Sequence, residues 1–204
     1  MTKVGIVSTG LCNIDSIARA VEECGATPLV TSERGNLEQA SHIVLPGVGA
    51  FPAAMARLRG AGLDEELTEQ VVGRGVPFLG ICLGMQLLAT RGHEVEETAG
   101  LGWIEGETTA LQAGPGERIP HIGWNEVERA ADSPLFAGIE PQKDFYFVHS
   151  FVLRPARSED IAGTTAFGGG FVSSVHRDNV YGVQFHPEKS QRAGFAVLRN
   201  FLAL

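Results

Sequence analysis

The chain contains 204 residues, of which 44% are hydrophobic, and it carries a formal net charge of -8. This length and apolar content allow one globular core, so we expect residues 1–204 to form a single domain that needs no disulfide or metal. The acidic balance, without a basic stripe, argues against nucleic acid as a partner, and no apolar run has the length needed to cross a membrane.

Cysteine and histidine usage limits the compartment and the cofactors. The three cysteines are an odd number without CxxC spacing, and Met1-Thr2-Lys3 leads directly into a strand pattern without a signal peptide. We therefore expect a cytoplasmic protein. His93 lies in a polar segment without partners at metal-ligand spacing, and we expect neither a metal nor a cofactor.

The first half of the chain alternates apolar runs of strand length with amphipathic segments of helix length. This alternation predicts a doubly wound, mostly parallel α/β sheet flanked by helices. The expected elements are strand 3–8, helix 14–24, strands 27–31 and 42–45, helices near 51–59 and 63–74, strand 76–81 and helix-forming residues at 85–89.

The second half of the chain predicts an antiparallel extension of the sheet. Gly168-Gly169-Gly170 lies between two strand patterns at hairpin distance, and Ser190 is expected to cap a closing amphipathic helix. The expected elements are strands 104–111, 119–128, 145–153, 161–166, 171–176 and 180–185, and helix 193–202.

Gly80-Ile81-Cys82-Leu83-Gly84 places a cysteine where a buried strand gives way to a helix. A residue at such a corner has a strained backbone, and glycines two positions before and after it remove side chains that would clash. The helix N-terminus favours the thiolate. We therefore predict that Cys82 is a nucleophile rather than a buried structural cysteine.

A thiolate nucleophile needs a base, and His186 is the best candidate among the six histidines. It follows strand 180–185, at a strand end, where α/β sheets place their ligands. Glu188 lies two residues further on and is able to hydrogen-bond the second imidazole nitrogen. The rival base is His149, which has no carboxylate nearby in the sequence. The pattern predicts a Cys82-His186-Glu188 arrangement.

Pro46-Gly47-Val48-Gly49-Ala50-Phe51 breaks a strand pattern with a glycine-rich loop. Such a loop either turns a backbone N–H toward a developing oxyanion or serves only as a turn between strand and helix. In the first case the N–H of Leu83, directly after the nucleophile, is the second oxyanion donor.

Two of these motifs, 80–86 and 186–188, resemble the class I (triad) glutamine amidotransferases. Four segments, 46–51, 120–125, 145–150 and 186–190, further resemble the glutaminase subunits of imidazole glycerol phosphate synthase, an enzyme of histidine biosynthesis. The resemblance covers essentially the whole chain. It implies the class I glutamine amidotransferase (flavodoxin-like) fold, with a central mostly parallel sheet, flanking helices and an antiparallel extension.

The resemblance also implies a reaction, the hydrolysis of L-glutamine to L-glutamate and ammonia. Cys82 attacks the side-chain amide, His186 passes a proton to the leaving ammonia, and the N–H groups of Val48 and Leu83 hold the oxyanion. The glutamine contacts carried over are Gly49, Gln86, and backbone groups of Ser150 and Phe151.

The partner implied by the resemblance is a (β/α)8-barrel cyclase subunit, which would take up the ammonia within a heterodimer. The residues carried over to that interface are His121, Trp124, Asn125, Tyr146 and Lys189.

The chain departs from the family near its start, where Thr9-Gly10-Leu11-Cys12 precede Asn13 in place of an aromatic residue and glycines. Three alternatives stay open. The chain could serve another class I synthase, of the pyridoxal phosphate or anthranilate type. A cysteine peptidase or a redox protein with its cysteine at the same strand-to-helix corner, the elbow at 80–84, would not require Glu188. A non-catalytic binding subunit would not require the intact triad.

Overall fold

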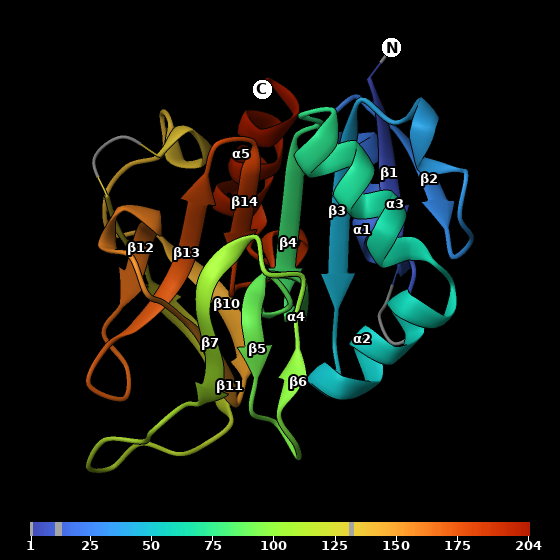
Figure 1. The fold of residues 1–204 in the computed structure, drawn as a ribbon. Coiled ribbons are helices and arrows are strands. Elements are labelled where there is room, and N and C mark those ends of the chain that lie inside the picture. Colours follow the sequence, from blue (N-terminus) through green and yellow to red (C-terminus); the bar gives the residue numbers. More distant parts are fainter. Residues whose placement is uncertain (1, 11–13, 131–132) are drawn as a thin grey trace.

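The computed structural model describes residues 2–10, 14–130 and 133–204, so Cys12 and Asn13 in the atypical N-terminal segment lie outside the described residues. An eight-stranded sheet runs through the molecule (Figure 1). Its strands lie in the order β2 (Thr27–Thr31), β1 (Lys3–Val7), β3 (His42–Gly47), β4 (Phe78–Cys82), β14 (Val180–Val183), β13 (Phe171–Arg177), β12 (Ile161–Thr165) and β9 (Glu128–Arg129).

The direction of pairing changes in the middle of this sheet. The pairs from β2 to β14 are all parallel, whereas β14, β13, β12 and β9 pair antiparallel. The predicted parallel sheet with an antiparallel extension is confirmed. Strand β4, which ends at Cys82, and strand β14, which leads to His186, pair with each other at the centre, where both faces are covered and apolar strand residues are buried.

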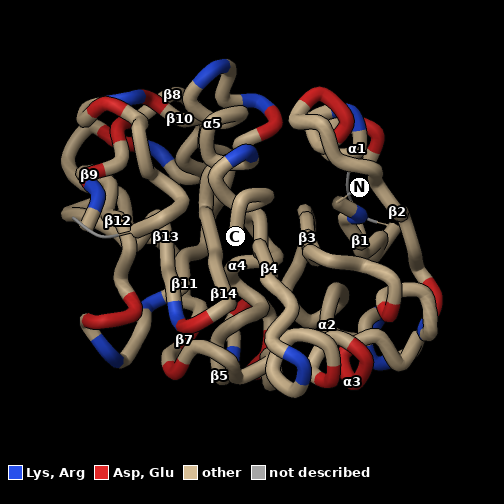
Figure 2. The backbone as a smooth tube through the Cα atoms, turned by 90° about the horizontal axis from the view of Figure 1, so that it is seen from above, with Lys and Arg blue, Asp and Glu red and all other residues tan. Residues whose placement is uncertain are grey.

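Helices cover both faces of the parallel half (Figure 2). On one face, α1 (Ile14–Glu23) and α5 (Gln191–Leu202) pack against alternate strand residues such as Ile6 and Ile81. On the other face, α2 (Phe51–Gly60) and α3 (Leu63–Thr68) pack against Ile43 and Leu45. This alternation within single strands is the period-2 pattern of a sheet buried on two sides. The last turn of the predicted helix 63–74 is a π-helix, Glu69–Gly73.

Smaller sheets lie beside the main one. A four-stranded sheet has the order β11 (Phe151–Pro155), β7 (Ile104–Ala110), β5 (Ala89–Gly92) and β6 (Thr98–Ala99), and a two-stranded ribbon joins β8 (His121–Glu126) to β10 (Asp144–His149). One-turn helices occupy Leu37–Gln39, Leu83–Gln86 (α4), Pro134–Phe136, Ser158–Asp160 and Pro187–Lys189.

Three strand or helix predictions are wrong in extent. The expected strands 119–128 and 145–153 each divide between two sheets, because the chain leaves the β8–β10 ribbon after Glu126 and after His149. The helix expected at 85–89 ends at Gln86, and Ala89 already belongs to β5. The Gly168–Gly170 hairpin between β12 and β13 is confirmed.

The surface carries charges of both signs. In Figure 2, Lys and Arg positions are interspersed with Asp and Glu positions rather than gathered into one stripe. Among the helices of the described residues, none is long and apolar enough to cross a membrane.

Candidate active site

Cys82 is the last residue of β4 and has φ 54° and ψ -109°, a backbone conformation that is strained for a residue with a side chain. Close packing holds it there. A Cβ on Gly84 would lie 1.8 Å from the carbonyl oxygen of Leu45, and a Cβ on Gly80 would lie 2.5 Å from the carbonyl oxygen of Gly84. Both glycines are therefore required for the corner that presents the thiol.

His186 reaches the same corner because β14 runs parallel to β4, with Val183 opposite Ile81. Its Nδ1 lies 3.0 Å from Oε1 of Glu188, and both side chains are 5% exposed. Its Nε2 is buried, and the ring interacts with the Cys82 side chain. The structure thus brings together the three residues predicted as a triad.

The electrostatics of His186 follow from this geometry. Burial lowers its pKa, but hydrogen bonding and charge from Cys82 and Glu188 outweigh burial and raise the pKa to about 9. At neutral pH the imidazolium is therefore the favoured form of His186.

The backbone of His186 is tied to the ribbon through Ser190. The His186 N–H donates to the Tyr146 carbonyl (2.9 Å), the Ser190 hydroxyl donates to the His186 carbonyl (2.6 Å), and the Tyr146 N–H donates to the same hydroxyl (2.9 Å). Ser190 stands at the N-cap position of α5 but makes no side-chain capping bond, so the predicted cap is wrong. Its hydroxyl binds the backbone carbonyl of His186 instead.

Cys82 lines a cavity of ≈ 420 Å³. Gly47 is paired with Cys82 across β3 and β4, so the following residues, Val48 and Leu83, come side by side at the cavity wall. The lining residues are Val48, Gly49, Ala50, Cys82, Leu83, Gln86, Glu94, Pro120, Val148, His149, Ser150 and Phe151. All the residues expected to hold the oxyanion or glutamine therefore surround one cavity.

A family model described as "Glutamine amidotransferase class-I" matches residues 7–204. The chain belongs to this family. Subunits named HisH of imidazole glycerol phosphate synthase are 45% identical in Moorella thermoacetica, over 98% of this chain and 94% of theirs, and 44% identical in Caulobacter vibrioides, over 99% and 98%. A Campylobacter jejuni HisH subunit is 43% identical over 94% of this chain and 95% of its own. The resemblance to this subunit is confirmed.

Solved structures agree on the fold of this amidotransferase. The PurLQS structure from Thermotoga maritima superposes with a TM-score of 0.77 at 20% identity, over 99% of this chain and 98% of that one. A putative GMP synthase protein from Thermoplasma acidophilum superposes with a TM-score of 0.75 at 19% identity, over 100% and 93%. At such identities the likeness extends to the fold and not to the substrate.

Gln86 is the most constrained of the residues expected to bind glutamine in this amidotransferase. Its Nε2 donates to the Phe151 carbonyl (2.9 Å) and to Oε1 of Gln184 (3.0 Å). Because an amide nitrogen has two hydrogens, both are used within the protein, and Oε1 is the end left to meet a substrate.

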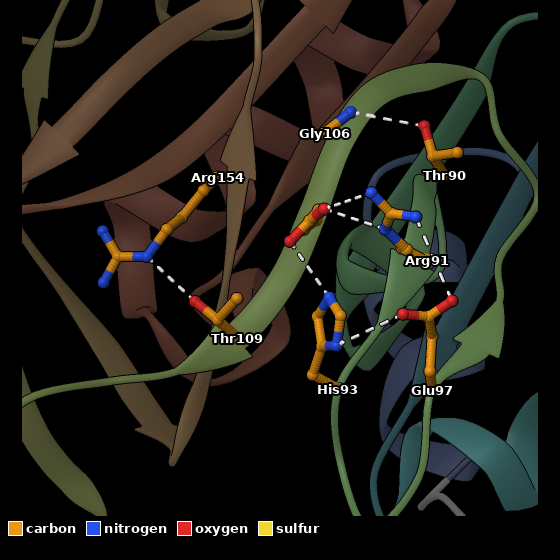
Figure 3. Close-up of polar contacts among 8 residues, drawn as sticks. Thr90, Arg91, His93, Glu97, Gly106, Thr109 and Arg154 are labelled. Carbon is orange, nitrogen blue, oxygen red and sulfur yellow. Dashed lines mark hydrogen bonds and ion pairs between the residues drawn. The ribbon is translucent and has the colours of Figure 1, made fainter.

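Glu94, which lies next to His93 in the same polar segment, also lines the cavity. Its Oε2 accepts the Phe51 N–H at the start of α2 (2.7 Å). The segment that carries Glu94 is fixed by a cluster of charges, in which Arg91, His93 and Glu97 point toward one another (Figure 3). Arg91 Nε and His93 Nε2 lie 2.8 and 3.0 Å from the Glu107 carboxylate on β7. In the sequence, Glu94 is only a carboxylate downstream of Cys82, and this pattern is not specific enough to identify it as a site residue.

His149 is held in a role other than that of a base. Its Nδ1 lies 3.0 Å from the Phe151 carbonyl and its Nε2 lies 3.0 Å from Nδ1 of His121. Burial lowers its pKa to about 3. A histidine that is neutral and fully engaged in this way does not compete with His186.

The residues carried over to the partner interface lie on opposite faces of the β8–β10 ribbon. Trp124 is 47% exposed, its ring lies 5.9 Å from that of Tyr146, and Nζ of Lys189 lies 5.9 Å over the Tyr146 ring. His121 is 5% exposed and Asn125 hydrogen-bonds to it from the inner face at 3.5 Å. Trp124, Tyr146 and Lys189 thus form a surface, whereas His121 and Asn125 lie behind it.

A larger hollow of ≈ 1010 Å³ lies at the outer end of the ribbon, beside Trp124 and Pro134, and contains none of the triad residues. In the described part of the chain, no group of three or more His, Cys, Asp and Glu side chains is arranged to hold a metal ion.

Proposed function

We propose that this chain is the glutaminase subunit of an imidazole glycerol phosphate synthase. It hydrolyses L-glutamine to L-glutamate and ammonia and delivers the ammonia to a cyclase subunit that forms imidazole glycerol phosphate in L-histidine biosynthesis. The observation that carries this proposal is Cys82, which lines a cavity of ≈ 420 Å³ and also interacts with the His186–Glu188 pair. Residues 1–204 act as one domain, in the cytoplasm.

The reaction proceeds by two acyl transfers. The Cys82 thiolate attacks the side-chain carbonyl of glutamine, and the N–H groups of Val48 and Leu83 hold the resulting oxyanion. The His186 imidazolium then gives its proton to the leaving ammonia, and a thioester remains. His186, now neutral, takes a proton from water, which cleaves the thioester to glutamate. Glu188 keeps Nδ1 protonated and Nε2 directed at the sulfur throughout.

The amino-acid end of glutamine is recognised by groups further along the cavity. The carbonyl oxygens of Ser150 and Phe151 already accept hydrogen bonds within the protein, from Leu111 N–H (2.8 Å) and from Gln86 and His149 (2.9 and 3.0 Å). The N–H groups of this segment therefore suit the α-carboxylate. The α-ammonium group is bound by the Glu94 carboxylate and by Oε1 of Gln86.

The partner is a (β/α)8-barrel cyclase subunit that docks on the outer face of the β8–β10 ribbon, to give a heterodimer. Ile122 and Trp124 on this face are 60% and 47% exposed, which is a large apolar surface for a single ribbon. With Tyr146 and Lys189 it has the aromatic and cationic composition of an interface centre. The inner side of the same ribbon touches the triad, because the Tyr146 carbonyl accepts the His186 N–H.

The test compares glutamate release from glutamine by the chain alone and by its mixture with a purified cyclase subunit. We expect stimulation by the cyclase, and we expect Cys82→Ala to lose glutamate release by at least about a thousandfold because no other group forms the thioester. Cys82→Ala should still support cyclisation from added ammonium salt, which controls for folding and docking. Substantial glutamate release by Cys82→Ala would contradict the assignment of Cys82 as the nucleophile. If the cyclase subunit does not stimulate glutamate release by the wild-type chain, the proposed partner is wrong.

A further inference from the structure

Gln184 is a fully buried side chain next to the nucleophile that the triad mechanism does not use. It follows β14, two residues before His186, and is 0% exposed. Its Nε2 lies 3.6 Å from Sγ of Cys82, and its Oε1 lies 3.0 Å from Nε2 of Gln86. A backbone hydrogen bond from its N–H to the Ser173 carbonyl (2.9 Å) fixes its place beside β13.

The orientation of the Gln184 amide is determined by its neighbours. The Phe151 carbonyl can only accept, so the end of Gln86 that faces it must be the NH2 group. The second hydrogen of that NH2 group then requires an acceptor, which is Oε1 of Gln184. Gln184 therefore presents an N–H, and not an oxygen, to the Cys82 sulfur.

The Phe151 carbonyl also accepts a hydrogen bond on its other side, from His149. His149 must carry its proton on Nδ1 to reach the Phe151 carbonyl, so its Nε2 accepts from Nδ1 of His121. Nε2 of His121 then accepts from the Asn125 amide, whose oxygen accepts the Glu126 N–H (2.9 Å). Every group in this buried network has one consistent assignment, and such networks are rigid.

The sulfur itself needs a donor when it is ionised. Besides the interaction with His186, two hydrogen bonds join Cys82 Sγ to groups in the described chain, one to the Val148 carbonyl at 3.8 Å and one from Gln184 Nε2 at 3.6 Å. A thiol donates to that carbonyl, but a thiolate has no hydrogen to donate and is repelled by it. α4 contains only four residues, so its dipole adds little. The His186 imidazolium supplies one donor to a buried thiolate, and burial of the charge makes a second donor favourable.

We propose that Gln184 is a positioning residue for the nucleophile: its N–H donates to the Cys82 sulfur, favours the thiolate and directs it into the cavity, while Gln86 fixes the amide. This inference rests on the proposed function for its catalytic consequence, but not for its effect on the thiol.

The test uses Gln184→Glu, which preserves the shape of the side chain and an oxygen for Gln86 but replaces the N–H with a carboxylate oxygen. The readout is the pH profile of Cys82 alkylation by iodoacetamide, followed by peptide mapping. We expect the midpoint of the alkylation profile to rise by about one pH unit or more in Gln184→Glu, because the loss of a hydrogen bond to a charged group shifts its titration by about that much. We also expect kcat for glutamine, measured with the cyclase, to fall about tenfold or more with little change in KM.

Gln70→Glu is the matched control, since Gln70 is 2% exposed and lies in the π-helical turn Glu69–Gly73, where its carbonyl accepts the Val76 N–H just before the start of β4, whereas Cys82 is at the end of that strand. It should leave the alkylation midpoint and kcat unchanged. The neutral Gln184→Met repeats the test if the charged variant does not fold, and a rise in the midpoint is expected there too.

An unchanged midpoint in the folded Gln184 variant overturns the proposal, as does an equal rise in Gln70→Glu. The proposed function fails differently. If wild type with the cyclase releases no glutamate but the midpoint still rises in Gln184→Glu, the role of Gln184 stands and the substrate is wrong.

Discussion

Replacing His149 with Gln should make the stability of the protein less sensitive to acid. His149 is 6% exposed, and burial is the largest cause that lowers its pKa to about 3. The charges of His121 and His186 lower it further, while the hydrogen bond to the Phe151 carbonyl opposes them. The folded protein therefore keeps this ring neutral at a pH where an unfolded chain would protonate it.

The sign and size of the effect follow from linkage. An unfolded histidine has a pKa of about 6.5, so above that pH neither state binds the proton and stability is unaffected. Between pH 6.5 and 3 the unfolded state binds the proton and the folded state does not, so the free energy of unfolding falls as the pH falls. At pH 5 the loss due to His149 is about 2 kcal/mol, from 1.36 kcal/mol per pH unit over 1.5 units.

The assay is urea unfolding at pH 8 and pH 5. Wild type should lose about 2 kcal/mol more than His149→Gln between these pH values. Phe171→Leu is the control, because the Phe171 ring packs 4.9 Å from the His149 ring and its loss removes packing but no titrating group. Phe171→Leu should lose as much free energy of unfolding between pH 8 and pH 5 as wild type.

The contribution of His186 to the pH dependence has the opposite sign. Its pKa in the folded protein is raised to about 9, so its contribution to stability is fully present below pH 6.5 and is lost as the pH rises through 9. It is present in all three proteins and cancels. Equal acid losses in wild type and His149→Gln would refute the reasoning.

Two further predictions concern the elbow and its thiol. Gly84→Ala should lower the free energy of unfolding by about 3 kcal/mol or more, because its Cβ would overlap the Leu45 carbonyl, whereas Gly60→Ala, with nothing within 4 Å, should cause no loss in the same urea titration. Iodoacetamide at pH 7 should label Cys82 well before Cys24, because burial raises the pKa of Cys24. Glutamine should protect Cys82 from labelling, since Cys82 lines the cavity. If peptide mapping finds Cys24 modified at a comparable rate, Cys82 is not activated.

The elements that could be predicted from the sequence are those with strong local signals. Strand 27–31 and the glycine-flanked corner at Cys82 depend on apolar runs and on glycine, so their patterns are visible in a short window. The division of 145–153 at Ser150 has no such signal, because both halves read as alternating strand. It results from pairing with β8 on one side and β7 on the other, which are distant in sequence.

The candidate site shows the same limit. Cys82, His186 and Glu188 stand in recognisable local motifs, whereas Glu94 and Gln184 gain their roles only when β5 and β14 are brought beside the elbow. His121 is the opposite case. Its sequence motif indicated a residue on the partner surface. In the structure its ring is 5% exposed, lies on the inner face of the ribbon and stacks on the Phe167 ring, with 4.1 Å between the ring centroids.

The last prediction concerns the peptide between Gly47 and Val48. Gly47 ends β3 opposite Cys82, Val48 is 38% exposed at the cavity wall, and Gly49 has φ 98°, so the loop bends sharply just beyond the oxyanion position. A peptide between two glycine-flanked positions rotates with little hindrance, and its N–H turns toward or away from the oxyanion. We expect the isolated chain to hydrolyse glutamine slowly. The cyclase, occupied by its ligand, should accelerate the hydrolysis, because one oxyanion donor changes kcat by about a hundredfold or more.

The test is Gly47→Ala, in which the new methyl group would lie 3.0 Å from Cβ of Leu83 and restrict the rotation of the peptide. The ratio of stimulated to basal kcat should therefore change more than the KM for glutamine, with Gly60→Ala as the unaffected control. Full activity of the isolated wild-type chain, or a Gly47→Ala ratio equal to that of wild type, would show that this peptide does not control the reaction.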